Sequence, residues 1–462
     1  MTERADLAVV GAGISGLAAA WEARRQGARV VVLDAAPRPG GKLQTSAFAG
    51  AALDEAADAF LARVPEGVEL CAELGITSDL VSPGVSAAHV FHDGELRPLP
   101  ADQLLGVPTD LDAVAASGLL SPAGVERARR DLTAADDRPR PGADESVGAL
   151  VRRRLGDEVL DRLVAPLVGS IYAGDCDALS LQVSAAQLAA ARDRDPADPS
   201  LVRAAAALRA QAVETGRPVF LAPAGGMGRL VAALADALGD DLRTGVPVTG
   251  LVPDGTGWRL EPGGLVAEAV VVATPAFAAA PLLAPVAPAA ADVLAGIEHA
   301  SVTLVALAVP ASGIDRPLDG SGFLVPRSAG LLLTACSWVT SKWPHLAIEP
   351  GVAVLRASVG RDGDDRATAL DDATLVARVL ADLTTTMGLR AEPLEVRVSR
   401  WPRSFPQPRP GHLDRVAAAE AALAAASPRL GLAGAWARGV GVPACIRGAR
   451  QAAARVVGAE VY

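Results

Sequence analysis

Aromatic residues are scarce in this sequence, at 3% of 462 residues, although hydrophobic residues of all kinds make up 50%. The apolar content is therefore mostly small aliphatic side chains. This composition excludes an intrinsically disordered chain, because it supplies enough apolar surface for a packed core. A chain of this length is expected to form about two or three domains.

Cysteine and histidine are also few, and neither forms a recognisable motif. The four cysteines lack C-x-x-C spacing, so the sequence predicts buried, reduced thiols in a cytoplasmic protein. The five histidines lack the spacing of a metal site, so no bound metal is expected. These residues are Cys71, Cys176, Cys336 and Cys445, and His89, His92, His299, His345 and His412.

Positive charge is in deficit. The formal net charge is −10, and the absence of a basic field argues against nucleic acid as a partner. An anionic substrate would therefore depend on arginines placed locally in its binding site.

Long apolar runs that could cross a membrane are missing too. The longest uncharged run, Ala269 to Ala291, is interrupted by Pro275, Pro281, Pro285 and Pro288, which excludes one continuous helix. The N-terminal residues MTERADLAVV lack the organisation of a signal peptide. The sequence predicts no transmembrane span. Peripheral contact with a membrane stays open, because the chain is alanine-rich and its mean hydropathy is +0.29.

The most informative stretch lies at the start of the chain. Asp6 to Val10 is predicted to be a buried strand, a helix follows to about residue 26, and Arg29 to Leu33 is a second strand. Gly11, Gly13 and Gly16 have the G-x-G-x-x-G spacing between the first strand and the helix. They allow the tight turn, the approach of a pyrophosphate and close packing of helix on strand. The stretch predicts a βαβ unit that binds a dinucleotide, the alternative being a structural glycine-rich turn.

Two further features indicate which dinucleotide. Asp34 ends the second strand, where a carboxylate accepts hydrogen bonds from ribose hydroxyls and repels a 2′-phosphate. A second glycine-rich loop with Gly40, Gly41 and Lys42 follows directly, where a nicotinamide dehydrogenase would continue into another βα unit. One long cofactor across both loops is favoured, and FAD is favoured over a nicotinamide dinucleotide.

A second glycine-opened helix is predicted near the end of the chain. Leu430 to Ala433 is predicted to be a strand, glycines including Gly439 and Gly441 form a loop, and Pro443 fits the first turn of a helix. In the FAD interpretation, the positive end of this helix faces the pyrimidine edge of the flavin. The alternative is an ordinary helix cap.

Between these ends the pattern changes several times. Asp54 to Leu74 has helical periodicity with a break at Pro65, and Val248 is expected on a strand that contacts the adenine or packs in the core. A hairpin turns at Asp93-Gly94, and residues 299–400 alternate strands with one helix. We therefore expect an α/β fold in which a Rossmann-type FAD-binding domain (1–75, 215–295 and 425–462) is joined by an α+β substrate-binding domain (76–100 and 296–424) and an inserted helical lobe (101–214).

Several stretches together resemble a known family. They are VVGAGISGL, RPGGK, LDEAADAFLARVPEGVELCAELG, LVAPLVGSIYAGDCDALSL, RWPRSFPQPRPGHLDRV and ARGVGVPACI. The chain resembles the FAD-dependent protoporphyrinogen and coproporphyrinogen oxidases of haem synthesis, within the wider amine oxidase and phytoene desaturase superfamily. It departs from them at Ala56 and Ala59, where the family has a glycine and a serine, and at Ala435, where it often has asparagine.

The resemblance implies a set of site residues. Arg63 stands where the family places a basic residue for a substrate propionate, its alternative being a solvated helix arginine. The implied FAD-binding residues are Gly11, Ala12, Gly13, Ile14, Ser15, Gly16, Asp34, Ala35, Gly41, Lys42, Ala56, Ala57, Asp58, Ala59, Val248, Trp401, Val440, Gly441 and Val442.

The implied reaction is the six-electron oxidation of coproporphyrinogen III to coproporphyrin III. FAD takes hydride from meso carbons, pyrrole N–H groups lose protons, and three O₂ are reduced to three H₂O₂. Substrate tautomers can relocate hydrogens, so no acid or base residue is assigned. Protoporphyrinogen IX is an accepted second substrate, and hand-off of the product to a ferrochelatase stays open. The alternatives are a protoporphyrinogen IX oxidase proper, a flavin amine oxidase or desaturase, and a non-catalytic escort protein on the same fold.

Overall fold

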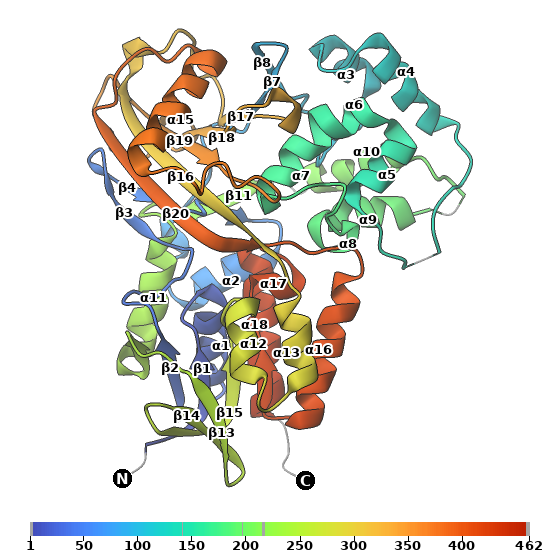
Figure 1. Cartoon of the computed structure of the whole chain (residues 1–462). Coiled ribbons are helices and arrows are strands. Elements are labelled where there is room, and N and C mark those ends of the chain that lie inside the picture. Colours follow the sequence, from blue (N-terminus) through green and yellow to red (C-terminus); the bar gives the residue numbers. More distant parts are fainter. Residues whose placement is uncertain (1–2, 141, 196, 215–217, 459–462) are drawn as a thin grey trace.

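A computed structural model describes residues 3–140, 142–195, 197–214 and 218–458. Figure 1 shows a sheet flanked by helices in the lower half, a second sheet at the upper left and a helical lobe at the upper right. This mixed α/β architecture confirms the predicted fold class. The exact domain boundaries stay a prediction, and those at residues 1, 215 and 462 lie outside the described residues.

The first sheet collects strands from widely separated parts of the chain. Its order is β12-β2-β1-β15-β14-β13, with β21 also paired to β15. The pairs β12–β2, β2–β1, β1–β15 and β15–β21 are parallel, and the central strands β1, β2 and β15 are largely apolar because both faces of the sheet are covered. The strands are β1 (Arg4–Val10), β2 (Val30–Asp34), β12 (Leu242–Thr244), β13 (Gly250–Asp254), β14 (Gly257–Glu261), β15 (Leu265–Val272) and β21 (Leu430–Leu432).

Helices cover both faces of this sheet, and β1 shows how the faces divide. Leu7 and Val9 belong to one apolar core, whereas Ala8 and Val10 belong to the other, as the two-residue period of a strand requires. The first core is closed by α1 (Ile14–Arg25), α11 (Gly228–Leu238), α18 (Val442–Val457) and α2 (Pro65–Glu73). The second is closed by α12 (Ala276–Leu283), α13 (Pro288–Ala295), α16 (His412–Ala426) and α17 (Ala435–Arg438).

The position of α16 differs from the expected division of the chain. The expected division assigns residues up to 424 to the second domain, whereas Val416, Ala419 and Leu423 of α16 are buried in the second core of the first sheet. Its apolar face therefore belongs by packing with α13, beside which it lies in Figure 1.

The second sheet has the order β20-β16-β19-β18-β17-β7-β8. Helix α15 (Asp372–Met387) covers one face with Leu375, Val379 and Leu383. The hairpin between β7 and β8 turns at Asp93-Gly94, both with positive φ (50° and 79°), as predicted. The elements are β7 (His89–His92), β8 (Glu95–Pro98), β16 (His299–Pro310), β17 (Gly322–Leu324), β18 (Leu333–Trp338), α14 (Val339–Lys342), β19 (Val352–Val359) and β20 (Glu395–Pro406).

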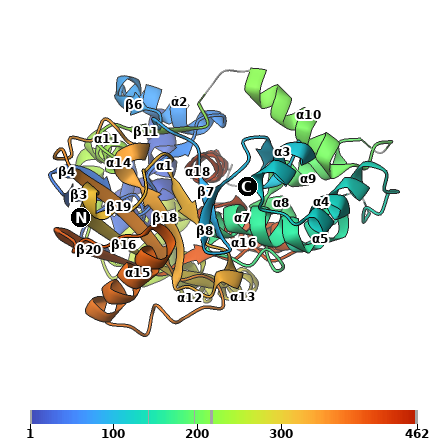
Figure 2. The same ribbon diagram turned by 90° about the horizontal axis from the view of Figure 1, so that it is seen from above.

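The helical lobe has a core of its own and lies beside the second sheet, as Figure 2 shows from above. An ion pair between Arg154 Nε and Asp131 Oδ1 (2.7 Å) is buried inside it. A π-helical turn, Leu160–Val164, interrupts the step from α6 to α7. The lobe contains α3 (Leu111–Ser117), α4 (Pro122–Arg129), α5 (Val147–Leu155), α6 (Asp157–Val159), α7 (Ala165–Tyr172), α8 (Leu181–Ser184), α9 (Ala186–Asp193) and α10 (Leu201–Glu214), with β9 (Gln103–Leu104) and β10 (Val107–Pro108).

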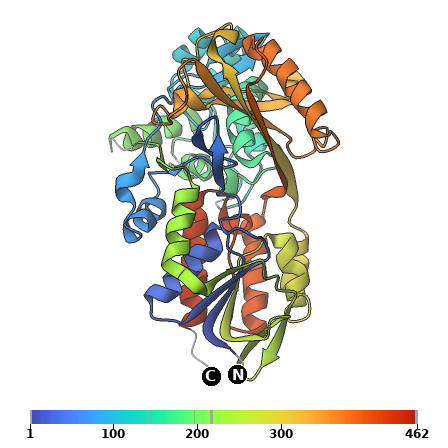
Figure 3. The same ribbon diagram turned by 90° about the vertical axis from the view of Figure 1, so that its left-hand side faces the viewer.

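Short strands connect the two sheets, which lie one above the other in Figure 3. They correct one expectation, because only Pro65–Glu73 of the stretch predicted to be helical from residue 54 to 74 is a helix. Residues 55–59 form a loop, and Phe60 pairs with Leu221 across a three-stranded sheet. The short strands are β3 (Thr45–Phe48), β4 (Ala51–Asp54), β5 (Phe60–Leu61), β6 (Leu80–Val81) and β11 (Phe220–Pro223).

Two other predictions concern the whole molecule. All four cysteines are buried and free of disulfides, as expected. Over the residues that the structure describes, no helix combines the length and the apolar character needed to cross a bilayer.

Candidate functional site

One cavity of about 1270 Å³ lies between the first sheet, the second sheet and the helical lobe. It collects almost all of the residues predicted to bind the cofactor, although they come from seven separate runs of the sequence. Of these residues, Ala12 and Gly16 do not line the cavity. The predicted residues that do are Gly11, Gly13, Ile14, Ser15, Asp34, Ala35, Gly41, Lys42, Ala56, Ala57, Asp58, Ala59, Val248, Trp401, Val440, Gly441 and Val442.

The turn between β1 and α1 explains why each glycine stands where it does. Gly11 has φ +104°, a conformation that favours glycine, and a Cβ on Gly16 would lie 1.7 Å from the carbonyl oxygen of Gly11. Gly16 thus packs helix on strand and does not line the cavity. A Cβ on Gly13 would meet no atom within 4 Å, so this backbone faces open space where a pyrophosphate can approach.

Asp34 organises the same turn from the end of β2. Its Oδ2 accepts a hydrogen bond from the Ala12 N–H at 2.5 Å, and its Oδ1 accepts one from the Ala36 N–H at 2.7 Å. A carboxylate has about four acceptor positions, so two remain for ribose hydroxyls. Ala12 therefore contributes by holding Asp34 in place.

Two helices begin at the cavity without a side-chain cap. Gly13 is the N-cap of α1 and Gly441 is the N-cap of α18, and neither helix has a side chain that accepts from its first-turn N–H groups. Such N-termini carry unsatisfied donors and a partial positive charge, which suit an anionic group. The two helices pack against each other, so their partially positive N-termini have a fixed arrangement at the cavity.

The loop of residues 55–59 is held from behind by a buried charge cluster. Asp58 Oδ2 lies 2.8 Å from Lys342 Nζ and 2.9 Å from Arg356 Nη2, and it accepts a hydrogen bond from the Trp343 indole N–H at 3.3 Å. Burial raises the pKa of Asp58, but the two cations outweigh burial and the net shift is downward. The Asp58 side chain thus fixes the loop in position.

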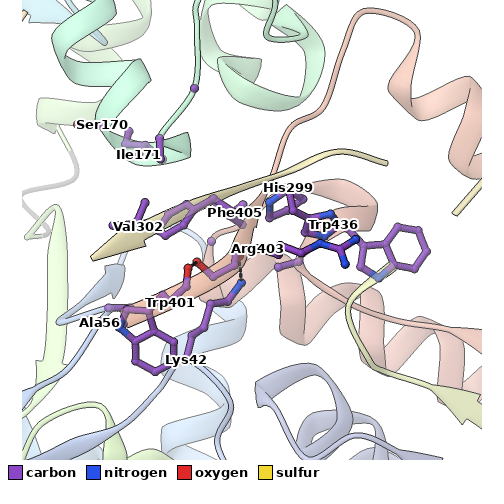
Figure 4. Close-up of a pocket in the computed structure, with 18 of the residues that line it drawn as sticks. Lys42, Ala56, Ser170, Ile171, His299, Val302, Trp401, Arg403, Phe405 and Trp436 are labelled. Atoms are coloured by element: carbon purple, nitrogen blue, oxygen red, sulfur yellow. Dashed lines mark hydrogen bonds between the residues drawn. The ribbon is translucent and has the colours of Figure 1, made fainter. Parts of the chain in front are cut away.

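Trp401 and Lys42 lie side by side in the cavity, near Ala56 (Figure 4). The Trp401 indole N–H donates to the Glu55 carbonyl oxygen at 2.9 Å, and Lys42 Nζ donates to the Ser404 carbonyl oxygen at 2.5 Å. Burial lowers the pKa of Lys42, which has no carboxylate within ion-pair distance among the described residues. Lys42 is therefore a cation available to the cavity.

His299 supplies a neutral polar group next to them. Its pKa is lowered to about 4, chiefly by burial and further by the charges of Lys42 and Arg403. Its Nδ1–H donates to the Ile297 carbonyl oxygen (2.9 Å), which leaves Nε2 as an acceptor. The Arg403 guanidinium stacks on the Phe277 ring at 3.8 Å.

The part of the cavity beyond Trp401 is apolar. Ala173, Val302, Leu304 and Phe405 form one cluster there, and Ile171 projects from α7 on the opposite side (Figure 4). Ile171 is 46% exposed, unusually so for a large apolar residue. This wall is suited to the face of a large, flat, apolar ligand.

Two predicted site residues and two unpredicted ones differ from the rest. Arg63 is exposed and is absent from the residues that line the cavity, so the structure does not bring it together with the others and its propionate-binding role stays a prediction. Val248 lines the cavity from the segment between β12 and β13, and the expectation that it lies on a strand is wrong. Arg327 and Arg361 line the cavity without having been predicted, because single arginines after strand ends carry no sequence signal.

These residues fit a flavin dinucleotide. The open space at Gly13, the free acceptor positions of Asp34 and the two uncapped helix N-termini match its pyrophosphate, ribose and flavin ring. In the part of the chain that the structure describes, no three His, Cys, Asp or Glu side chains are arranged to hold a metal ion.

Comparison with known proteins agrees with this fit. Residues 14–457 match the family described as flavin containing amine oxidoreductase. Coproporphyrinogen III oxidase of Bacillus subtilis is 33% identical over 455 residues, covering 95% of each chain, and that of Mycobacterium tuberculosis is 36% identical over 458 residues, covering 97% of this chain and 96% of its own.

Solved structures agree as well. A proposed protoporphyrinogen oxidase from Exiguobacterium superposes with a TM-score of 0.85 at 30% identity, covering 99% of both chains. A putrescine oxidase at 21% identity shares the fold, with a TM-score of 0.71 over 99% of this chain and all of its own. The chain therefore belongs to the flavin-containing amine oxidoreductase family, within it to the family of the coproporphyrinogen III oxidases, and its cofactor is FAD.

Proposed function

We propose that this protein is an oxygen-dependent coproporphyrinogen III oxidase, which forms coproporphyrin III and H₂O₂. The observation that carries the proposal is the single cavity of about 1270 Å³ that joins the FAD-binding residues to an apolar wall with arginines on it. Sites for one small ligand are about 300 to 1000 Å³, so this cavity has room for the cofactor and a second large molecule. Relatives at 33% and 36% identity that carry this name support the same assignment.

The chain's own residues would position the substrate. FAD, when bound, supplies the hydride acceptor, and O₂ is the final oxidant. The cluster of Val302, Leu304 and Phe405 packs against one face of the macrocycle and excludes water, and Ile171 approaches from the other side. The neutral His299 presents Nε2 as a hydrogen-bond acceptor, and Lys42 and the N-terminus of α18 stabilise negative charge at the cofactor.

The test compares two porphyrinogens side by side. Purified protein with FAD in air is expected to generate the fluorescence of coproporphyrin III, with about three H₂O₂ per porphyrin by stoichiometry, and to use protoporphyrinogen IX less well. Much faster oxidation of protoporphyrinogen IX would contradict the substrate assignment. Peroxide formation from putrescine alone would indicate an amine oxidase, and a protein without flavin absorbance after reconstitution would not be this enzyme.

The proposal also covers the compartment of the protein and the transfer of its porphyrin product. Four free, buried thiols suit a reducing compartment, so we place the protein in the cytoplasm. The product is a metal-free porphyrin, which is the kind of substrate a ferrochelatase takes. The test measures the lag before a ferrochelatase inserts metal into coproporphyrin III. Direct transfer predicts a shorter lag when this protein supplies the porphyrin than when free coproporphyrin III is added. An unchanged lag would argue for release into solution.

A further inference from the structure

Two arginines in the cavity wall have no anionic partner. Arg327 lies in the turn after β17, and Arg361 follows β19 by two residues. Among the described residues, no carboxylate comes within 4 Å of either guanidinium group. Arg327 donates only to a carbonyl oxygen, that of Asp362 at 2.9 Å, and the Arg361 guanidinium makes no hydrogen bond in this part of the chain.

Three other basic residues at the same cavity are differently placed. Arg152 is ion-paired with Asp177 (2.8 Å), and Arg356 and Lys342 share Asp58. Those charges are neutralised by the protein itself, whereas the charges of Arg327 and Arg361 are not.

The carboxylates next to Arg361 in the chain are already paired with other cations. Asp362 lies next to Arg361 in the chain, but its side chain is 3.0 Å from Arg409 Nη2. Asp364 faces Arg361 across a local β-bridge, but it is paired with Arg366 at 2.7 Å. The positive charge of Arg361 is therefore available to a bound anion.

The backbone that carries Arg361, and the Arg327 side chain, are also held in place without a ligand. The Asp362 N–H donates to the Ala173 carbonyl oxygen at 2.7 Å, which ties the loop after β19 to the end of α7. The hydrogen bond from Arg327 to the Asp362 carbonyl oxygen joins the two loops to each other. Side chains carried on a fixed backbone lose less freedom when they bind a partner than side chains on a mobile loop.

Electrostatics agrees with an anion at this position. Burial, followed by the charge of Arg327, lowers the pKa of Arg361 to about 10, so Arg361 stays protonated at neutral pH but is poorly compensated. Burying a charge without a partner is unfavourable, and a bound carboxylate would remove that penalty. A planar guanidinium group matches a carboxylate with two parallel hydrogen bonds.

We propose that Arg327 and Arg361 together form a binding site for the propionate groups of the substrate. This inference rests on the proposed function, because it takes coproporphyrinogen III as the ligand. The cofactor does not need this site, since its pyrophosphate is served by Gly13 and the N-terminus of α1 on the first sheet. Val325 and Leu304 also line the cavity, so a carboxylate carried on an apolar skeleton suits it better than a fully hydrated anion.

The test uses stable product molecules as probes. Coproporphyrin III and its tetramethyl ester are titrated into the FAD-loaded protein, and binding is followed by fluorescence. We examine Arg361→Gln, Arg327→Gln and the conservative Arg361→Lys. The matched control is Arg390→Gln, which removes the same charge from an exposed arginine paired with Asp315 away from the cavity.

The expected pattern is specific to charge. Each glutamine variant in the cavity should bind coproporphyrin III about tenfold or more weakly, because a charge-assisted hydrogen bond is lost. Binding of the ester should stay as in the wild type, Arg361→Lys should recover part of the affinity, and Arg390→Gln should change neither. Flavin absorbance and melting temperature identify any variant that fails to fold.

Two results would overturn the assignment, and they can be told apart from failure of the proposed function. Equal affinity for coproporphyrin III in the cavity variants and in Arg390→Gln would overturn the arginine site alone. An equal loss for acid and ester would also overturn it, because it would indicate damage to the cavity and not the loss of a charge contact. If the wild type binds neither probe, the proposed function and this inference both fail.

Discussion

Replacing Asp58 with asparagine tests how the cofactor loop is held. The change keeps the size of the side chain and removes the charge that Lys342 and Arg356 share. At 2.8 and 2.9 Å, each attraction amounts to about 6 kcal/mol with an effective dielectric constant of about 20. Desolvation of the three groups offsets most of that sum, because their side chains are only 11–19% exposed.

Removing one partner of a buried ion pair leaves the other charges uncompensated. We therefore expect Asp58→Asn to lower the apparent free energy of unfolding by about 3 to 5 kcal/mol. The same change at Asp315 breaks an exposed pair with Arg390, whose side chains are 50% and 76% exposed, and should lower it by at most about 1 kcal/mol.

Urea unfolding of the FAD-loaded proteins measures both variants, and FAD fluorescence in the filtrate measures how much cofactor each releases. Asp58→Asn should also release more FAD, because the loop of residues 55–59 lines the cavity. The reasoning is refuted if Asp58→Asn and Asp315→Asn unfold at the same urea concentration and retain FAD equally.

Two other predictions concern glycine packing and a buried acid. Gly16→Ala should destabilise the protein, because its Cβ would lie 1.7 Å from the Gly11 carbonyl oxygen. Gly13→Ala has open space around its Cβ, so it should weaken FAD binding with little loss of melting temperature in FAD-free protein. Melting curves with and without FAD separate the two, and equal destabilisation would contradict the assigned roles. Burial raises the pKa of Asp54 from 3.8 to about 6, so the folded state binds this proton more tightly, and the stabilisation it brings is lost as pH rises through about 6. The wild type should therefore lose about 1.4 kcal/mol of its free energy of unfolding between about pH 5 and pH 7.5, whereas Asp54→Asn should not lose this amount. Parallel pH profiles of the free energy of unfolding in the two proteins would contradict this.

The parts of the site that local chemistry determines could be predicted from the sequence. Gly11, Gly13 and Gly16 are fixed by contacts within one βαβ unit, and Asp34 reaches the same turn from the next strand. Gly441 and the start of α18 could be predicted in the same way, because a glycine loop followed by a proline marks a helix N-terminus. Each needs only its neighbours, so a pattern of about thirty residues contains the information.

Long-range contacts explain what the sequence could not predict. Residues 55–59 have helical periodicity, but Trp401 and Lys342 bind this segment in a loop conformation. Trp401 bonds to Glu55, 346 residues away in the chain, and Lys342 bonds to Asp58, 284 residues away. Tertiary contacts of that kind override local preference. Arg327 and Arg361 were missed for a related reason, because their free charge becomes visible only once Asp362 and Asp364 are seen to pair elsewhere.

The first sheet also determines when the cofactor site can form during synthesis. Strand β21 completes the sheet beside β15, and α18 packs on α1 and brings the second uncapped N-terminus to the cavity. Residues 430–457 are translated about 400 residues after residues 4–34, so at about 5 to 20 residues per second the two halves are separated by about 20 to 80 s. During that interval a growing chain lacks the second half of the FAD site, and the apolar face of α1 that α18 later covers stays open to chaperones.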